Sequence, residues 1–164
     1  MERKIGTLIR KIVASTLMII GFSSVGVVVH EAGHLIVNNA LGGSGEIFYN
    51  YTLTAGHMDW ITLPEHHIWL VYLAGGFIAA FILFLFFWLP ARLTPSIQDV
   101  YVEGAVAGTI LTNLFYAPTE LILYYYGQRL FEWAYIASYI IATIVFCLLY
   151  IKKLVKWVYW MPKK

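Results

Sequence analysis

The chain has 164 residues, of which 60% are hydrophobic and only 12% are charged. Because an average globular protein carries about a quarter charged residues, this composition excludes an ordinary soluble domain and indicates a lipid environment. A net charge of +2 is too small to indicate a nucleic-acid partner. The single cysteine, Cys147, excludes both a disulfide framework and a cysteine-based metal site.

Four stretches are apolar enough to cross a bilayer, which takes about 20 residues of helix. They cover residues 7–41, 68–89, 100–126 and 133–151. Gly42 is expected to end the first span, and Pro90 the second. We therefore predict an all-α integral membrane protein with four transmembrane helices, folded as a single membrane-embedded domain over residues 1–164.

Basic residues indicate how the spans are oriented. Most of them lie at the two ends of the chain, as Arg3, Lys4, Arg10, Lys11, Lys152, Lys153, Lys156, Lys163 and Lys164. Arg92 belongs to the same side because two spans separate it from the N-terminus, and only Arg129 falls on the other side. By the positive-inside rule, both termini of this multi-pass protein are predicted to be cytoplasmic.

The segment between the first two spans has a different composition. Residues 47–54 are rich in aromatic and β-branched side chains, Ala55-Gly56 favours a turn, and residues 57–63 return with a similar pattern. This predicts a small β-hairpin over residues 47–63. The segment has no Lys or Arg, which agrees with an external location.

The sequence His30-Glu31-Ala32-Gly33-His34 matches the pattern His-Glu-x-x-His. On a helix, positions i and i+4 share a face, so both imidazoles can bind one metal ion. Zinc suits such ligands, and Glu31 can take a proton from water and pass one to a leaving amine. Ionisable side chains within a span are costly unless paired or metal-bound, which favours a catalytic site over a structural or degenerate one.

Depth in the membrane selects the third ligand. Glu120 lies about 30 Å along a helix from the start of its span, and His30 lies about 33 Å from the start of the first span. The matching levels predict Glu120 as the third metal ligand, whereas Asp99 and Glu103 should lie near the opposite surface, in water or paired with Arg92. Alternative ligands are available in the external segment, at His57, Asp59, His66 and His67.

Other residues of the third span share the helix face of Glu120. Asn113 and Tyr116 fall at the required spacing, and Pro118, which lies between Tyr116 and Glu120, should loosen the helix. Asn113 is predicted either to donate to a substrate carbonyl or to form an interhelical hydrogen bond, and Tyr116 either to contact substrate or to pack. Gly75-Gly76, early in the second span, is typical of close helix packing.

From about Ser24 to Leu123 the chain resembles the site-2 protease family of intramembrane metalloproteases. His30 to His34 is the specific match; Leu73-Ala-Gly-Gly76 and Thr112 to Glu120 are similar to two looser family segments. The resemblance implies two histidine ligands, a catalytic glutamate, an acidic third ligand in the third span, and a hairpin strand that holds extended substrate. The family's acid is an aspartate, whereas here Leu121 aligns with it and Glu120 lies one position earlier.

These observations predict a zinc metalloprotease that cleaves peptide bonds in or near transmembrane segments, with lipid bilayer and membrane-protein substrates as its partners. Two alternatives stay open. One is a zinc-dependent membrane hydrolase of lipids or small amphiphiles, and the other is a catalytically dead homologue that binds membrane proteins. The sequence leaves the oligomeric state open.

Overall fold

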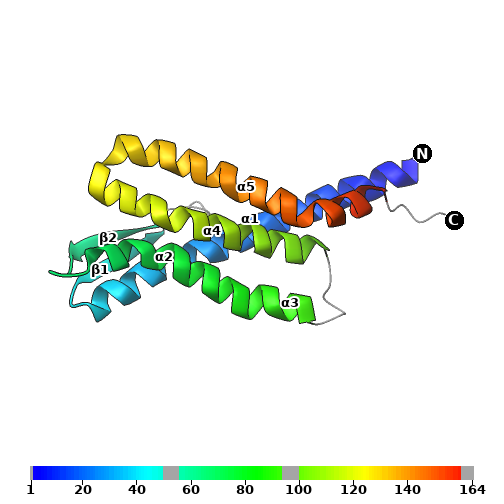
Figure 1. The fold of residues 1–164 in the computed structure, drawn as a ribbon. Helices are drawn as coiled ribbons and strands as arrows, with labels where there is room; N and C mark the ends of the chain where they lie inside the picture. The colour runs from blue at the N-terminus through cyan, green and yellow to red at the C-terminus, as the bar shows by residue number, and fades with distance from the viewer. Residues whose placement is uncertain (1, 50–55, 94–99, 160–164) are drawn as a thin grey trace.

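The structure is a computed structural model that describes residues 2–49, 56–93 and 100–159; within these, the side chains of 2–12, 14, 15, 49, 56–58, 100, 101 and 151–159 are not described. Its elements in chain order are α1 (Glu2–Ala40), β1 (Ser44–Tyr49), β2 (Gly56–Thr62), α2 (Ile68–Leu83), the π-helical turn η1 (Phe84–Trp88), α3 (Leu89–Leu93), α4 (Val100–Tyr126) and α5 (Gln128–Tyr159) (Figure 1). The predicted fold class, four long apolar helices with a small hairpin between the first two, is confirmed.

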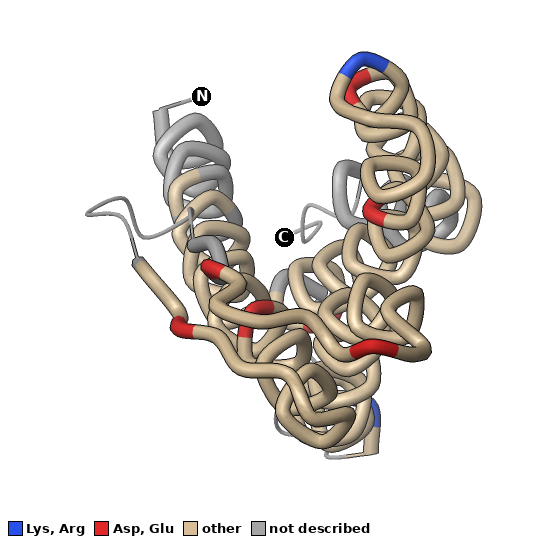
Figure 2. Tube along the Cα trace, turned by 90° about the vertical axis from the view of Figure 1, so that its left-hand side faces the viewer, with Lys and Arg blue, Asp and Glu red and all other residues tan. Residues whose placement is uncertain are grey.

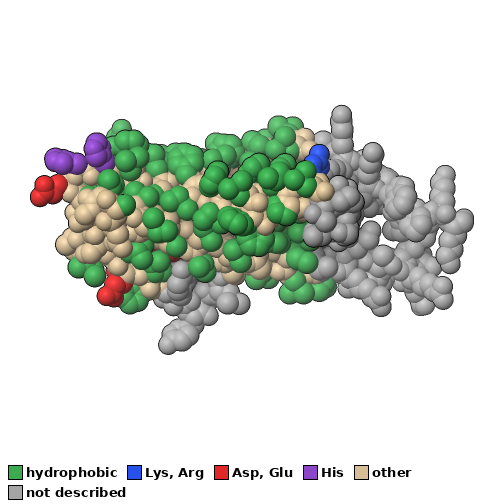
Figure 3. Space-filling model, turned by 90° about the horizontal axis from the view of Figure 1, so that it is seen from below, with side chains coloured by type: hydrophobic (Ala, Val, Ile, Leu, Met, Phe, Trp, Pro, Cys, Tyr) green, Lys and Arg blue, Asp and Glu red, His purple; other side chains and the backbone are tan. Residues whose placement is uncertain are grey.

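Within the residues that the structure describes, four helical stretches are long and apolar enough to cross a membrane, which indicates a multi-pass membrane protein. They are Thr16–Ala40, Ile68–Leu93, Val102–Tyr126 and Gln128–Tyr150. On the face shown in Figure 3, apolar side chains cover the middle, while acidic and histidine side chains lie at the hairpin end. Charged residues occupy only a few points of the described trace (Figure 2). Leu17, Phe86 and Leu148 are 64%, 69% and 69% exposed, as side chains in contact with lipid should be.

The helices are arranged so that α1, α2 and α4 pack against one another, while α5 packs chiefly on α4. The start of α1 and the end of α5 lie at the end of the molecule opposite the hairpin (Figure 1). This arrangement brings both ends of the helical bundle to the same end of the molecule.

Glycines allow α2 to approach its neighbours closely. A Cβ at Gly76 would collide with the backbone oxygen of Asn113 and lie 2.6 Å from the Cβ of Ala117 on α4. On the other side of α2, a Cβ on Gly33 of α1 would lie 3.0 Å from the backbone oxygen of Ala74. The predicted close packing at Gly75-Gly76 is therefore confirmed, since real Cβ atoms essentially never approach other atoms as closely as one at Gly76 would.

The predicted end of the second span at Pro90 is wrong. The helix continues through Pro90 to Leu93, so the candidate span is longer than the expected 68–89. Immediately before the proline, the Leu89 N–H bonds to the carbonyl of Phe84, five residues back, which makes η1 a π-helical turn. This local widening accommodates a ring that lacks an N–H and would otherwise crowd the preceding turn.

Helix α1 ends in a glycine motif that directs the chain into the hairpin. Gly42 has φ +90°, and the Gly43 N–H bonds to the Asn38 carbonyl at 2.9 Å, while the Gly42 N–H bonds to the Asn39 carbonyl at 3.1 Å. This is the Schellman pattern, for which glycine is suited because the left-handed region carries no Cβ penalty there. The predicted termination at Gly42 is thus confirmed.

The hairpin pairs β1 and β2 antiparallel, with Gly45 opposite Trp60 and Glu46 opposite Asp59. It begins at Ser44, slightly earlier than the expected residue 47, and the expected turn at Ala55-Gly56 lies partly outside the described residues. The Asn38 side chain donates from Nδ2 to the Thr62 carbonyl at 3.2 Å, which fixes the end of β2 to α1.

A polar cluster joins the helices at the end remote from the hairpin. Arg92 Nη1 donates to Glu103 Oε1 at 3.0 Å, so the expected pairing of Glu103 with Arg92 is confirmed. Tyr150 of α5 donates to the same oxygen at 3.4 Å and accepts from the Trp88 indole at 3.2 Å. Glu103 therefore serves to hold α3, α4 and α5 together; Asp99 lies outside the described residues.

We predict that Gly76→Ala destabilises the bundle by about 1–3 kcal/mol, the usual range for overpacking a close contact. The free energy of unfolding, measured by denaturant titration in mild detergent, checks this. Gly21→Ala is the matched control, because no atom lies within 4 Å of a Cβ added there. Equal stability of the two variants would show that α2 and α4 are not in close contact.

Candidate metal centre

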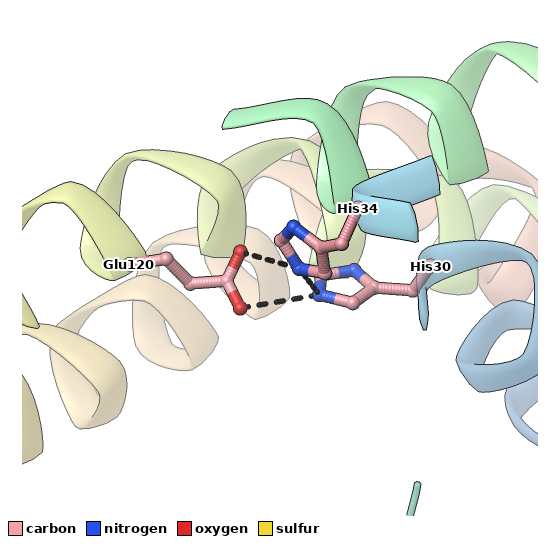
Figure 4. A group of neighbouring side chains, drawn as sticks. All are labelled: His30, His34 and Glu120. Carbon is pink, nitrogen blue, oxygen red and sulfur yellow. Dashed lines mark hydrogen bonds and ion pairs between the residues drawn. The ribbon is translucent and has the colours of Figure 1, made fainter. Parts of the chain in front are cut away.

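Three potential ligands converge at the hairpin end of the bundle. His30 and His34 lie one helical turn apart on α1, and α4 brings Glu120 to face both rings (Figure 4). His30 Nε2 lies 3.0 Å from His34 Nε2 and 3.2 Å from Glu120 Oε1, and His34 Nε2 lies 3.3 Å from Glu120 Oε2. The two histidines are 6% and 4% exposed, so this group is shielded from solvent.

The backbone of α2 fixes the protonation of the His34 ring. Its Nδ1 lies 2.7 Å from the Val71 carbonyl oxygen, which can only accept a hydrogen bond. Nδ1 must therefore carry the hydrogen and donate it. In a neutral imidazole the other nitrogen, Nε2, then presents a lone pair to the centre.

Asn113 fixes the His30 ring in the same way. The amide group of Asn113 donates from Nδ2 to the Thr109 carbonyl at 3.0 Å, which directs its oxygen Oδ1 toward His30. Oδ1 lies 3.1 Å from His30 Nδ1 and accepts the ring hydrogen. Because the Thr109 carbonyl sets the amide orientation, this assignment follows from the hydrogen-bond network. His30 Nε2 therefore also presents a lone pair to the centre.

Two lone pairs and a carboxylate that face one another require a positive charge between them. An added proton can bridge only one pair of atoms, and within the described part of the chain Glu120 Oε2 is buried without a hydrogen-bond partner. A single metal ion satisfies all three groups. Tetrahedral bonds of about 2.0–2.1 Å place ligand atoms about 3.3 Å apart, close to the separations of 3.0, 3.2 and 3.3 Å between these groups. The residues fit a four-coordinate ion with one position left open.

Space for the His34 ring is provided by Gly75 of α2. A Cβ at Gly75 would collide with His34 Nε2 and lie 2.6 Å from its Cε1. The Gly75-Gly76 pair thus has two functions, because Gly75 accommodates a ligand ring while Gly76 accommodates α4.

The other residues predicted for the site have defined positions. Glu31 directly follows His30 and is buried at 9% exposure. Tyr116 packs its ring 5.4 Å from that of His30 and 5.6 Å from that of Tyr135 on α5. Asn113 forms the interhelical hydrogen bond that was one of its two predicted roles, and its donation to a substrate carbonyl stays a prediction.

The alternative ligands do not join the three residues. Asp59, His66 and His67 are exposed, and within the described residues only His30, His34 and Glu120 form a group with metal-ligand spacing. The His57 side chain lies outside the described part of the structure. Helix α4 continues through Pro118, so the proline does not interrupt the helix that carries Glu120.

Sequence reasoning missed two neighbours of the centre. The ring of Trp60, on β2, lies 5.9 Å from that of His34, and the ring of Tyr72, on α2, lies 5.7 Å from that of Trp60. A tryptophan near a span end is the common pattern of the membrane interface, so its type and position alone do not indicate a site. No local sequence pattern identifies Trp60, because its contact with His34 depends on how the hairpin packs.

Comparisons with known proteins identify no relative. No family model matches the chain, and no curated protein and no solved structure matches it.

We predict that Glu120→Ala abolishes stoichiometric metal binding, whereas Glu103→Ala preserves it. Only the first substitution removes a ligand, so affinity should fall by more than the 10–100-fold typical of changes outside the ligand sphere. Metal content after dialysis against a weak chelator measures the difference. If Glu103→Ala lost the metal and Glu120→Ala kept it, the metal centre would lie at the opposite end of α4.

Asn113→Leu is expected to weaken metal binding by about 10–100-fold, because His30 loses the acceptor that orients its ring. Competition with a chelating dye measures the dissociation constant. The control is Asn38→Leu, which removes a fully buried amide that bonds to the Thr62 carbonyl rather than to a ligand ring. Equal losses from both substitutions would contradict a role for Asn113 in ring orientation.

Proposed function

We propose that this chain is an intramembrane zinc metalloprotease of the site-2 protease type, which hydrolyses peptide bonds in or near transmembrane segments of membrane proteins. The observation that supports it most is the convergence of His30, His34 and Glu120 within membrane-spanning helices. The resemblance of residues 24–123 to that family supports the same reaction. The acid is a glutamate one position before the family's aspartate, and its carboxylate faces both rings (Figure 4).

Zinc is the proposed metal because two imidazole nitrogens and one carboxylate, with a fourth position open, form a typical catalytic zinc site. Calcium and magnesium prefer sets of oxygen ligands. When bound, zinc supplies a Lewis acid that polarises the scissile carbonyl and lowers the pKa of water to near neutrality.

The chain's own residues hold this centre and transfer protons. Val71 and Asn113 fix the two rings with their Nε2 lone pairs directed inward, so little reorganisation is needed when the site acts. Glu31 takes the proton from the attacking water and then donates it to the nitrogen of the leaving amine. Burial of Glu31 beside the ligands keeps bulk water from competing for that proton.

The hairpin is the proposed binding element for substrate. A transmembrane helix hides its peptide bonds, so it must be locally extended before cleavage. An extended segment can add to the edge of a small sheet through main-chain hydrogen bonds. The β1–β2 hairpin packs against α1, the helix that carries both histidines, so a segment added to its edge passes close to the centre.

We also propose that both termini are cytoplasmic, which places the metal centre and the hairpin toward the external side. The support is the concentration of Lys and Arg at the two ends of the chain.

Glu31→Gln should lower the cleavage rate by at least about 10²–10⁴-fold, the usual contribution of a general base, while metal content and fold are retained. The probe is a set of lysine-flanked peptides with about 20 apolar residues, incubated with detergent-purified protein and followed by mass spectrometry. Glu132→Gln is the control, since Glu132 is exposed on α5 and pairs with Gln128.

Three outcomes contradict this proposal. Cleavage by Glu31→Gln at the wild-type rate would exclude the mechanism. Hydrolysis of lipid analogues without any peptide cleavage would favour a lipid or amphiphile hydrolase. Protein that binds no zinc at neutral pH would favour a catalytically inactive membrane-protein-binding homologue.

A further inference from the structure

Beside His34 lies a wall of three aromatic rings, each from a different element. Trp60 comes from β2, Tyr72 from α2 and Tyr124 from α4. The ring of Trp60 lies 5.9 Å from that of His34 and 5.7 Å from that of Tyr72, and the rings of Tyr72 and Tyr124 are 5.1 Å apart. The wall therefore extends from a metal-ligand candidate across α2 to α4.

The position of Trp60 is fixed by contacts that do not involve the metal. Fully buried Asn38, one helical turn beyond His34, donates to the carbonyl of Thr62 at 3.2 Å, and Thr62 lies two residues after Trp60 on the same strand. Across the hairpin, Trp60 faces Gly45, which has no side chain to compete with the indole for space. The strand thus holds the indole against the centre.

The aromatic wall is partly open to its surroundings. Trp60 and Tyr72 are half-buried, and Tyr124 is 40% exposed. The partly open wall retains apolar surface that an incoming side chain can cover.

We propose that Trp60, together with Tyr72 and Tyr124, forms a specificity subsite for the substrate residue that flanks the scissile bond, and that this subsite favours a bulky apolar or aromatic side chain. The proposal rests on the proposed proteolytic function. A substrate strand paired with the hairpin directs alternate side chains to the hairpin's inner face, where Trp60 is. Contact between an aromatic face and a large apolar side chain is favourable because both surfaces are removed from water. Desolvation of a charged side chain at the same place costs free energy.

The experiment uses a pool of lysine-flanked apolar peptides that is randomised at the central positions. Mass spectrometry of the products gives the residue distribution on each side of the cut, which does not depend on the overall rate. Wild-type protein should show a preference for large apolar residues at one flanking position. Trp60→Ala should reduce that preference about 10-fold or more, the discrimination typical of a hydrophobic pocket, and Trp60→Phe should retain most of it.

Trp69→Ala is the matched control, because Trp69 is 42% exposed near the start of α2 and is not part of the aromatic wall. Tyr124→Ala tests the same subsite at an exposed position where loss of fold is not expected, and it should relax the same preference. Zinc content is measured for every variant.

An unchanged residue distribution in zinc-loaded Trp60→Ala and Tyr124→Ala, with cleavage intact, overturns the subsite alone. Absence of cleavage by zinc-loaded wild-type protein overturns the proposed protease.

Discussion

The arrangement of hydrogens on two imidazole rings is the constraint on which the centre depends. Each ring uses Nδ1 to donate outward, His34 to the Val71 carbonyl and His30 to the Asn113 amide oxygen. The two inward nitrogens and the Glu120 carboxylate then carry lone pairs and net negative charge in a poorly solvated place. Such a group is costly in a membrane protein unless a cation sits among its members. The outer hydrogen bonds therefore define what the inner group can bind.

The helix packing supports this arrangement. Gly75 leaves room for the His34 ring, and neighbouring Gly76 lets α4 approach α2 closely enough to bring Asn113 and Glu120 to α1. Without close packing, long side chains would separate the helices, and the ligands would no longer converge. At the far end of the bundle, the cluster around Glu103 holds α3, α4 and α5 together. A few polar and small residues thus position the metal centre within a helical bundle whose outer surface is mainly apolar.

Periodicity and membrane depth predict much of this fold from the sequence. Apolar length identifies the four spans, the i, i+4 spacing places His30 and His34 on one face, and matching depth distinguishes Glu120 from Glu103. The path of the chain through Pro90 was not predictable, because a proline ordinarily ends or kinks a helix and the sequence does not indicate that the π turn η1 accommodates this one. The orientation of Asn113 depends on the Thr109 carbonyl, and the contact of Trp60 with His34 depends on how the hairpin packs. The contacts of Asn113 with His30 and of Trp60 with His34 join residues that are far apart in the sequence, and a single sequence does not reveal such contacts.

X-ray absorption at the zinc edge of the purified, detergent-solubilised protein would identify the ligands of the metal ion. We expect a four-coordinate ion with two imidazole nitrogens and oxygen ligands at about 2.0–2.1 Å, and with no sulfur. Imidazole scattering reports the two rings independently of any catalytic activity. A spectrum with one imidazole or none, or with a sulfur ligand at about 2.3 Å, would contradict convergence of His30, His34 and Glu120 on a single metal ion.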